Sequence, residues 1–160
     1  MDPHHNSDDS LEYVGFWPRV GATIIDALLI FAVTAPLLIA IYGSGYFLDE
    51  GPLIHGRADV LISWVFPCIA TVACWRTWQA TPGKLAVSAR VVDAVTGRPA
   101  SVGQLVMRYL AYFPSILAFG LGILWVAFDP RRQGWHDKLA GTVVIRPVRR
   151  GPEPVRFGRY

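Results

Sequence analysis

Cysteine is scarce in this sequence, and its scarcity excludes several classes of protein. The 160 residues include two cysteines, Cys68 and Cys74. Six residues apart on one helix, their side chains point to different faces, so they cannot form a disulfide with each other. Neither belongs to a cluster with the spacing of a metal site. The sequence therefore predicts no disulfide framework and no bound metal.

Motifs for nucleotide binding and nucleophilic catalysis are also missing. Gly120-Leu-Gly122 lacks the strand and helix that frame a dinucleotide-binding loop, and Thr81-Pro-Gly-Lys84 is too short for a phosphate-binding P-loop. His136 and Asp137 resemble half of a catalytic triad, but no glycine-flanked serine or reactive cysteine completes it. We therefore expect no enzyme and no cofactor.

Apolar residues, in contrast, are abundant and form long runs. Hydrophobic residues make up 52% of the sequence and the mean hydropathy is +0.35, both above the usual range of a soluble domain. The runs from about Phe16 to Tyr42 and from about Val60 to Trp78 can each cross a bilayer as a helix, which takes about 20 residues. A third run extends from Leu105 to Phe128. We expect an all-α membrane protein, a small transmembrane helical bundle of two full spans and a third apolar segment, in contact with the lipid bilayer.

Basic residues are concentrated between the second and third runs and again after the third. Lys and Arg beside apolar spans set orientation and meet anionic lipid, so we expect no nucleic-acid partner. Cytoplasmic loops carry an excess of Lys and Arg, which predicts a cytoplasmic amino end and middle loop and an external loop at residues 43–57.

Three simple crossings would place the two basic regions on opposite sides of the membrane, against this rule. Two resolutions are open. The third run is either broken at Pro114-Ser115 or at Gly120/Gly122 into a re-entrant hairpin or an interfacial helix with a shallow segment, or it crosses fully and leaves the tail outside. Arg108, one turn inside the run, favours an interfacial first half.

Two short stretches rich in β-branched residues, Leu85–Val92 and Thr142–Arg146, predict the strands of a short cytoplasmic flap. They can pair only if both lie on the same side of the bilayer. The chain then divides into a disordered tail at residues 1–12, a membrane domain at 13–147 and a basic tail at 148–160.

Asp26 lies inside the first apolar run, where a carboxylate costs about 2.5–3.5 kcal/mol. It should therefore face protein, a cation or water. Arg19 lies on nearly the same helix face, but seven residues span about 10 Å, so no direct contact is expected. Asp26 is either an ion or proton site, or a structural group hydrogen-bonded to Ser63, Thr71 or Arg108 on other helices.

A second group of polar residues, Asp129, His136 and Asp137, follows the third apolar run. Asp129 is expected to cap a helix end. Asp137 is expected to form an ion pair that locks the flap to the spans, and direct chemistry by His136 and Asp137 is the alternative. The candidate partners of Asp137 are Arg19, Arg90 and Arg108.

Three motifs, in order along the chain, resemble the RDD family of bacterial membrane proteins. They begin at Gly15-Phe-Trp-Pro-Arg19, at Thr81-Pro-Gly-Lys84 and at Trp135-His-Asp137, and together they cover about residues 13–147. The family takes its name from one arginine and two aspartates. These match Arg19, Asp26 and Asp137, with Asp129 as the alternative for the third place.

The resemblance implies a multi-pass protein of the bacterial cytoplasmic membrane, in a family for which transport is suggested and cation/proton exchange is proposed for some members. Our leading interpretation is that the protein helps move a small cation or proton, with Asp26 as the ionisable site. Two or three spans are too few to enclose a pathway, so a homo-oligomer is expected. The alternative is a non-catalytic accessory or scaffold subunit of a partner membrane protein, whose charged residues are structural.

Overall fold

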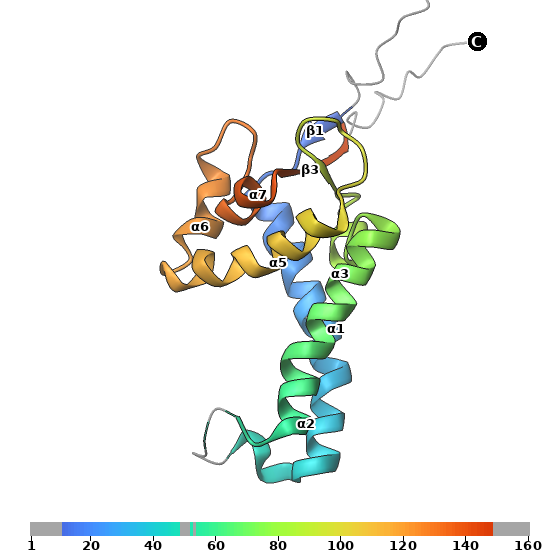
Figure 1. Ribbon diagram of the computed structural model, residues 1–160, viewed down its shortest axis with the longest axis vertical. Coiled ribbons are helices and arrows are strands. Elements are labelled where there is room, and N and C mark those ends of the chain that lie inside the picture. The colour runs from blue at the N-terminus through green and yellow to red at the C-terminus, as the bar shows by residue number, and fades with distance from the viewer. Residues whose placement is uncertain (1–10, 49–51, 53, 149–160) are drawn as a thin grey trace, which may run out of the picture.

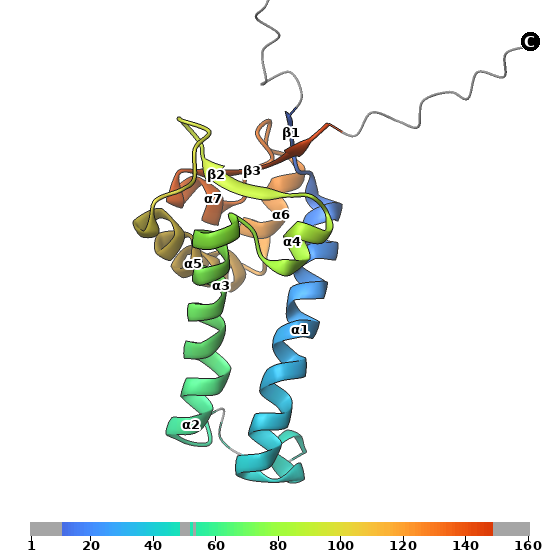
Figure 2. The same ribbon diagram turned by 90° about the vertical axis from the view of Figure 1, so that its right-hand side faces the viewer.

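The computed structural model describes residues 11–48, 52 and 54–148. Two long helical segments run antiparallel to each other and carry a compact head at one end (Figures 1 and 2). We define the head as residues 11–15 and 79–148, which contain the sheet and the shorter helices of the carboxyl-terminal half.

The first segment is helix α1, Phe16–Tyr42, with the bounds that the sequence predicts. After the 3₁₀ turn η2, Ser44–Phe47, the second segment consists of α2, Arg57–Val60, the π-helical turn η3, Leu61–Val65, and α3, Phe66–Trp78. The π turn lies directly before Pro67, which has no backbone N–H to donate to the preceding turn. Both segments are long and apolar enough to cross a membrane, as predicted.

The third apolar run is broken. Helix α5, Val102–Leu117, is followed by α6, Leu121–Leu124, and the 3₁₀ turn η4, Trp125–Ala127, and the two parts are bent by 113°. The chain turns at Phe119 and Gly120, which both have positive φ. The predicted break at Gly120 is confirmed, whereas a break at Pro114 is wrong, because α5 continues through that residue.

A three-stranded antiparallel sheet forms the top of the head, with β3, Thr142–Pro147, between β1, Leu11–Tyr13, and β2, Arg90–Asp93. Val91 on β2 lies opposite Val144 on β3. The two predicted strands therefore pair. This pairing brings both ends of the α5–α6 segment to the same end of the helix pair, and α5 runs across the long helices rather than along them (Figure 1).

Three expectations need correction. The predicted strand at 85–92 begins too early: its first two residues belong to helix α4, Pro82–Ala86, in which Pro82 pre-sets the helical φ at the first position, and β2 starts only at Arg90. Leu11 and Glu12 belong to strand β1 rather than to a disordered tail. The fold is mostly helical but not all-α, since three strands close the head. The rest of the predicted tail, residues 1–10, and residues 149–160 lie outside the described part of the chain.

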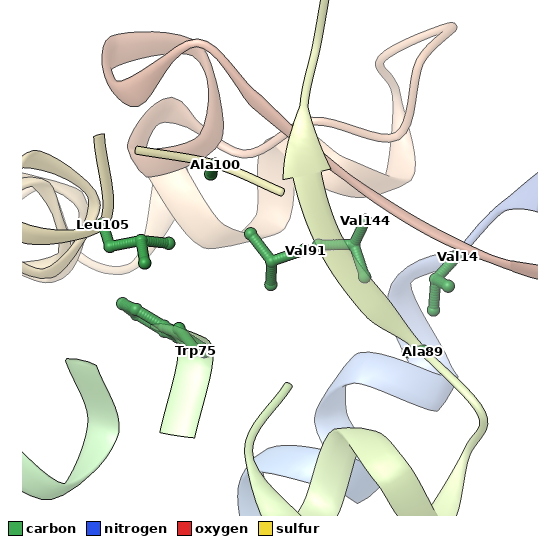
Figure 3. Packing of buried hydrophobic residues seen from close by; sticks show 7 residues of the cluster. All are labelled: Val14, Trp75, Ala89, Val91, Ala100, Leu105 and Val144. Carbon is green, nitrogen blue, oxygen red and sulfur yellow. The ribbon is translucent and has the colours of Figure 1, made fainter. Parts of the chain in front are cut away.

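The core of the head is a cluster of buried apolar side chains (Figure 3). Trp75 from α3 packs here with Leu105 from α5 and with Val91 and Val144 from the sheet. Val14, in the short link between β1 and α1, is also fully buried in it. Helix α7, Trp135–Ala140, packs against α5. The head is thus built on the ends of both long helices.

Candidate functional site

Asp137 joins the head to the first long helix. It lies in the first turn of α7 with no exposed surface. One carboxylate oxygen, Oδ2, accepts a hydrogen bond from Arg19 Nη1 at 2.6 Å and another from the Gly134 N–H at 3.0 Å. The other, Oδ1, accepts from Arg108 Nη1. The predicted ion pair of Asp137 is confirmed for Arg19 and Arg108; Arg90 is exposed on β2.

The guanidinium of Arg19 ties three parts of the chain together. Its Nε donates to the carbonyl of Val14 at 3.0 Å, and its Nη2 donates to the carbonyl of Arg132 at 2.7 Å. With Nη1 on Asp137, the planar group is held on three sides. Arg19 does not contact Asp26, as the helix spacing predicts.

Arg108 is buried completely. Its Nη1 also donates to the hydroxyl of Thr142 at 2.7 Å, and its guanidinium carbon lies 5.2 Å from the centre of the Trp75 ring. The sequence predicts Arg108 at an interfacial surface of the third run. It instead points into the head, because Asp137 on α7 neutralises its charge there.

The electrostatics of this group follow from burial and from the two arginines. Burial alone would raise the pKa of Asp137, but the charges of Arg108 and Arg19 outweigh it and hold that pKa below its ordinary value. Burial lowers the pKa of His136 to about 3 against the opposing pull of Asp137, so its ring is neutral near pH 7. The His136 ring stacks on Tyr112 with centroids 4.0 Å apart. His136 therefore packs as a neutral ring between Tyr112 and the ion-pair group of Arg19, Arg108 and Asp137.

Asp26 is bound by the segment that follows the second long helix. Its Oδ2 accepts from the hydroxyl of Thr81 at 2.5 Å, and its Oδ1 accepts from the Gly83 N–H at 2.7 Å. The prediction that Asp26 is hydrogen-bonded to Ser63, Thr71 or Arg108 is therefore wrong. Gly83 is required here, because a Cβ at this position would lie 2.0 Å from the carbonyl oxygen of Ala22.

Thr81 connects Asp26 to a buried lysine. Lys84 Nζ lies 3.5 Å from the Thr81 hydroxyl and 5.6 Å from the centre of the Trp75 ring. Burial lowers the pKa of Lys84. The sequence identifies the Thr81-Pro-Gly-Lys84 motif through the family resemblance, but it does not reveal that its hydroxyl and its amide bind Asp26 or that its amine contacts the hydroxyl.

Two cavities lie between the long helices below this group. A smaller one of about 130 Å³ is lined by Asp26, Thr71 and Thr81 among others, and a larger one of about 360 Å³ is lined by the same three residues together with Ser63 and Lys84. Ser63 and Thr71 thus face the same space as Asp26 without bonding to it.

Asp129 has a local role in the loop before α7. Its carboxylate pairs with Lys138 and accepts hydrogen bonds from the backbone N–H groups of Arg131 and Gln133, both at 3.1 Å. Asp129 therefore caps a turn, close to the role expected of it. Asp137 is the aspartate that Arg19 contacts.

A buried carboxylate at the opposite end of the helix pair was missed. Asp59 is 1% exposed and accepts hydrogen bonds from the Ser63 hydroxyl at 2.7 Å, the Tyr46 hydroxyl at 2.8 Å and the His55 N–H at 2.9 Å. The only sequence signal is the spacing of Asp59 and Ser63, one helical turn apart. Among the described residues, no group of three or more His, Cys, Asp or Glu side chains is placed to hold a metal ion.

Comparison with known proteins gives one family and several relatives. Residues 13–141 match the RDD family. The chain is 35% identical over 79 residues to the uncharacterized protein RP437 of Rickettsia prowazekii, which is 49% of this chain and 43% of that protein. It is 27% identical over 149 residues to the uncharacterized protein YxaI of Bacillus subtilis, with 82% and 95% of the two chains covered.

A third relative is the proline-rich antigen homolog of Mycobacterium tuberculosis, at 35% identity over 63 residues, or 39% of this chain and 26% of that protein. The chain thus spans less than half of the Rickettsia and Mycobacterium relatives. No solved structure matches the chain.

Proposed function

Because the chain belongs to the RDD family of membrane-associated proteins and has two helices able to cross a membrane, we propose that it is a multi-pass protein of the bacterial cytoplasmic membrane. The segments α1 and α2–α3 cross the bilayer, and the head with both basic regions lies on the cytoplasmic side, together with the amino end. The positive-inside rule supports this orientation. The α5–α6 hairpin lies in the interface, where its exposed apolar side chains, such as Leu110, Ile116 and Leu117, contact lipid.

Within this placement, Asp26 is the ionisable site through which a small cation or proton passes. The single observation that carries this proposal is the hydrogen-bonded row from Asp26 through the Thr81 hydroxyl to Lys84, above a cavity between the spans. The hydroxyl can pass its proton to the carboxylate while it accepts one from the ammonium group, so one proton moves from Lys84 to Asp26 and Thr81 remains a neutral hydroxyl. A lysine whose pKa is lowered by burial is suited to releasing that proton.

The exposed apolar surfaces of the two long helices support self-association. Large side chains such as Leu28, Phe31 and Ile69 are more than half exposed along them. Two spans cannot enclose a pathway, so copies of the chain supply the remaining wall.

The test is ion flux in liposomes that contain the purified protein and a pH-sensitive dye. An imposed sodium or potassium gradient should change the internal pH with the wild-type protein, and Asp26→Asn should abolish the change. Thr81→Val should reduce it, because the hydroxyl link is lost. Glu12→Gln, which removes a carboxylate from β1, is the matched control and should leave the flux intact. Unaltered flux with Asp26→Asn would contradict the role of Asp26.

A second candidate, an accessory or scaffold subunit, is favoured by a different observation. Each of the three side-chain nitrogens of Arg19 donates a hydrogen bond that holds the head to α1, so this residue of the family motif has a structural role. Purification in mild detergent separates the candidates: a stable companion protein and no flux would favour the scaffold.

A further inference from the structure

The head and the spans enclose a third cavity, of about 260 Å³, between α1, α5 and α6. We propose that this cavity binds the phosphate group of an anionic membrane lipid. The proposal goes beyond the passage of cations, and it needs only the placement of the helices in a membrane.

The cavity is lined by basic side chains. Arg19, Lys84 and Arg108 line it, and among the described lining residues there is no Asp or Glu. Asp137 and Asp26 lie behind this wall, bonded to the two arginines and to Thr81 respectively. Three cationic groups thus face two carboxylates, and the neutral ring of His136 adds no charge. The cavity is left with an excess of positive charge, which an anion would neutralise.

Arg108, which lines the cavity, has hydrogen-bond donors without partners in the structure. Its side chain is fully buried, and of its three nitrogens only Nη1 has hydrogen-bond partners in the structure. Nε and Nη2 are buried without a partner. An unpaired buried donor costs about 1–3 kcal/mol, and more on a charged group. A phosphate oxygen is a natural acceptor for the two free nitrogens, because the guanidinium fork matches its geometry.

The walls of the cavity favour a lipid as the source of the phosphate. Apart from the basic groups, they are mostly apolar, with Phe16, Val20, Ile116 and Ile123 among them. Ile24 on α1 and Ile116 on α5 are 55% and 58% exposed, so apolar surface continues from the cavity to the outside of the spans. A headgroup can enter here while its acyl chains lie along α1. Basic pockets between helices on the cytoplasmic side are a known setting for anionic headgroups.

Two matched pairs of variants test the proposal. Ile123→Trp fills the cavity from its apolar wall without touching a charged group, and Leu124→Trp adds the same side chain to the neighbouring exposed position outside the cavity. Lys84→Gln removes a lining charge, and Arg76→Gln removes an exposed charge near the end of α3.

The measurement is the ratio of lipid-bound to free protein by native mass spectrometry, for the full chain in mild detergent with phosphatidylglycerol or phosphatidylcholine added. The wild-type protein should retain phosphatidylglycerol in preference to phosphatidylcholine. Lys84→Gln should lower that ratio about fivefold, the effect of one cation on an anionic headgroup. Ile123→Trp should abolish the preference, whereas Leu124→Trp and Arg76→Gln should keep it within about twofold.

Thermal unfolding in the same detergent provides the second measurement. Phosphatidylglycerol should raise the unfolding midpoint of the wild-type protein, and inorganic phosphate at the same concentration should not. If inorganic phosphate raised the unfolding midpoint as much as phosphatidylglycerol does, the proposal that a lipid occupies the cavity would be overturned. It would also be overturned if the wild-type protein showed no preference for phosphatidylglycerol. Asp26→Asn should retain the lipid while losing ion flux, so failure of the ion site and failure of the lipid site give different results.

Discussion

Neutralising Asp137 should destabilise the protein more than any change to an exposed charge. In Asp137→Asn, Arg108 keeps its full burial but loses its counter-ion, and Arg19 loses one of its three partners. Removing one member of a buried ion pair costs about 3–5 kcal/mol, because the other charge remains buried and uncompensated. At about 2–4 °C per kcal/mol for a chain of this size, the unfolding midpoint should fall by roughly 6–20 °C.

The assay is thermal unfolding in mild detergent, followed by tryptophan fluorescence. Arg90→Gln is the matched control, because it removes an exposed charge on β2. A surface substitution of this kind changes stability by about 0.5 kcal/mol or less, so the midpoint should move by about 2 °C at most.

A double-mutant cycle tests the physical reason as well as the magnitude. Asp137→Leu combined with Arg108→Met removes both charges, so the double variant should be less destabilised than the two single losses added together. A loss below about 1 kcal/mol for Asp137→Asn, or strict additivity in the cycle, would refute the reasoning that a buried, mutually dependent ion pair holds the head to α1.

Three further predictions concern pH, packing and topology. The pKa of His136 is about 3 in the folded protein, against 6.5 ordinarily. Between these two pH values the unfolded chain binds a proton at this residue that the folded protein does not bind. The contribution of His136 to stability should therefore be complete above about pH 6.5 and fall on acidification by at most about 1.4 kcal/mol per pH unit. His136→Phe should flatten that slope in unfolding curves from pH 7 to pH 4, and an unchanged slope would exclude His136 as its source. Gly83→Ala should cost about 1–3 kcal/mol of stability, because the added Cβ clashes with α1. Gly21→Ala should not destabilise the protein, because a Cβ at that position meets no atom within 4 Å. Equal unfolding midpoints for the two variants would contradict the close approach of α4 to α1. In a chain whose two native cysteines are replaced by serine, Val148→Cys should react with a membrane-impermeant thiol reagent only after the cells are opened, and labelling of intact cells would place the head outside.

The elements that rest on strong local signals could be predicted from the sequence. The bounds of α1 follow from a long, mostly apolar run with Pro18 in its first turn. That Asp137 pairs with an arginine follows from the cost of burying unpaired charge, although the sequence left Arg19, Arg90 and Arg108 open as partners and the structure selects the first and the third.

The features that depend on tertiary contact could not be predicted. The carboxylate of Asp26 is satisfied by a backbone N–H at Gly83, and backbone donors carry no sequence signature. Strand β1 is three residues long and exists because β3 presents an open edge to it. The environment of Asp59 depends on Tyr46, which reaches it from the separate turn η2.

The ion pair of Arg19 with Asp137 joins residues 118 positions apart, and strand β3, which closes the sheet between β1 and β2, comes still later in the chain. During synthesis, Arg19 and Arg108 therefore leave the ribosome without the group that neutralises them. Assembly of the head must wait until the last tenth of the domain has been translated. A nascent chain that stops short of Asp137 would leave two arginines without their counter-ion, so the head should not form until that residue has been added.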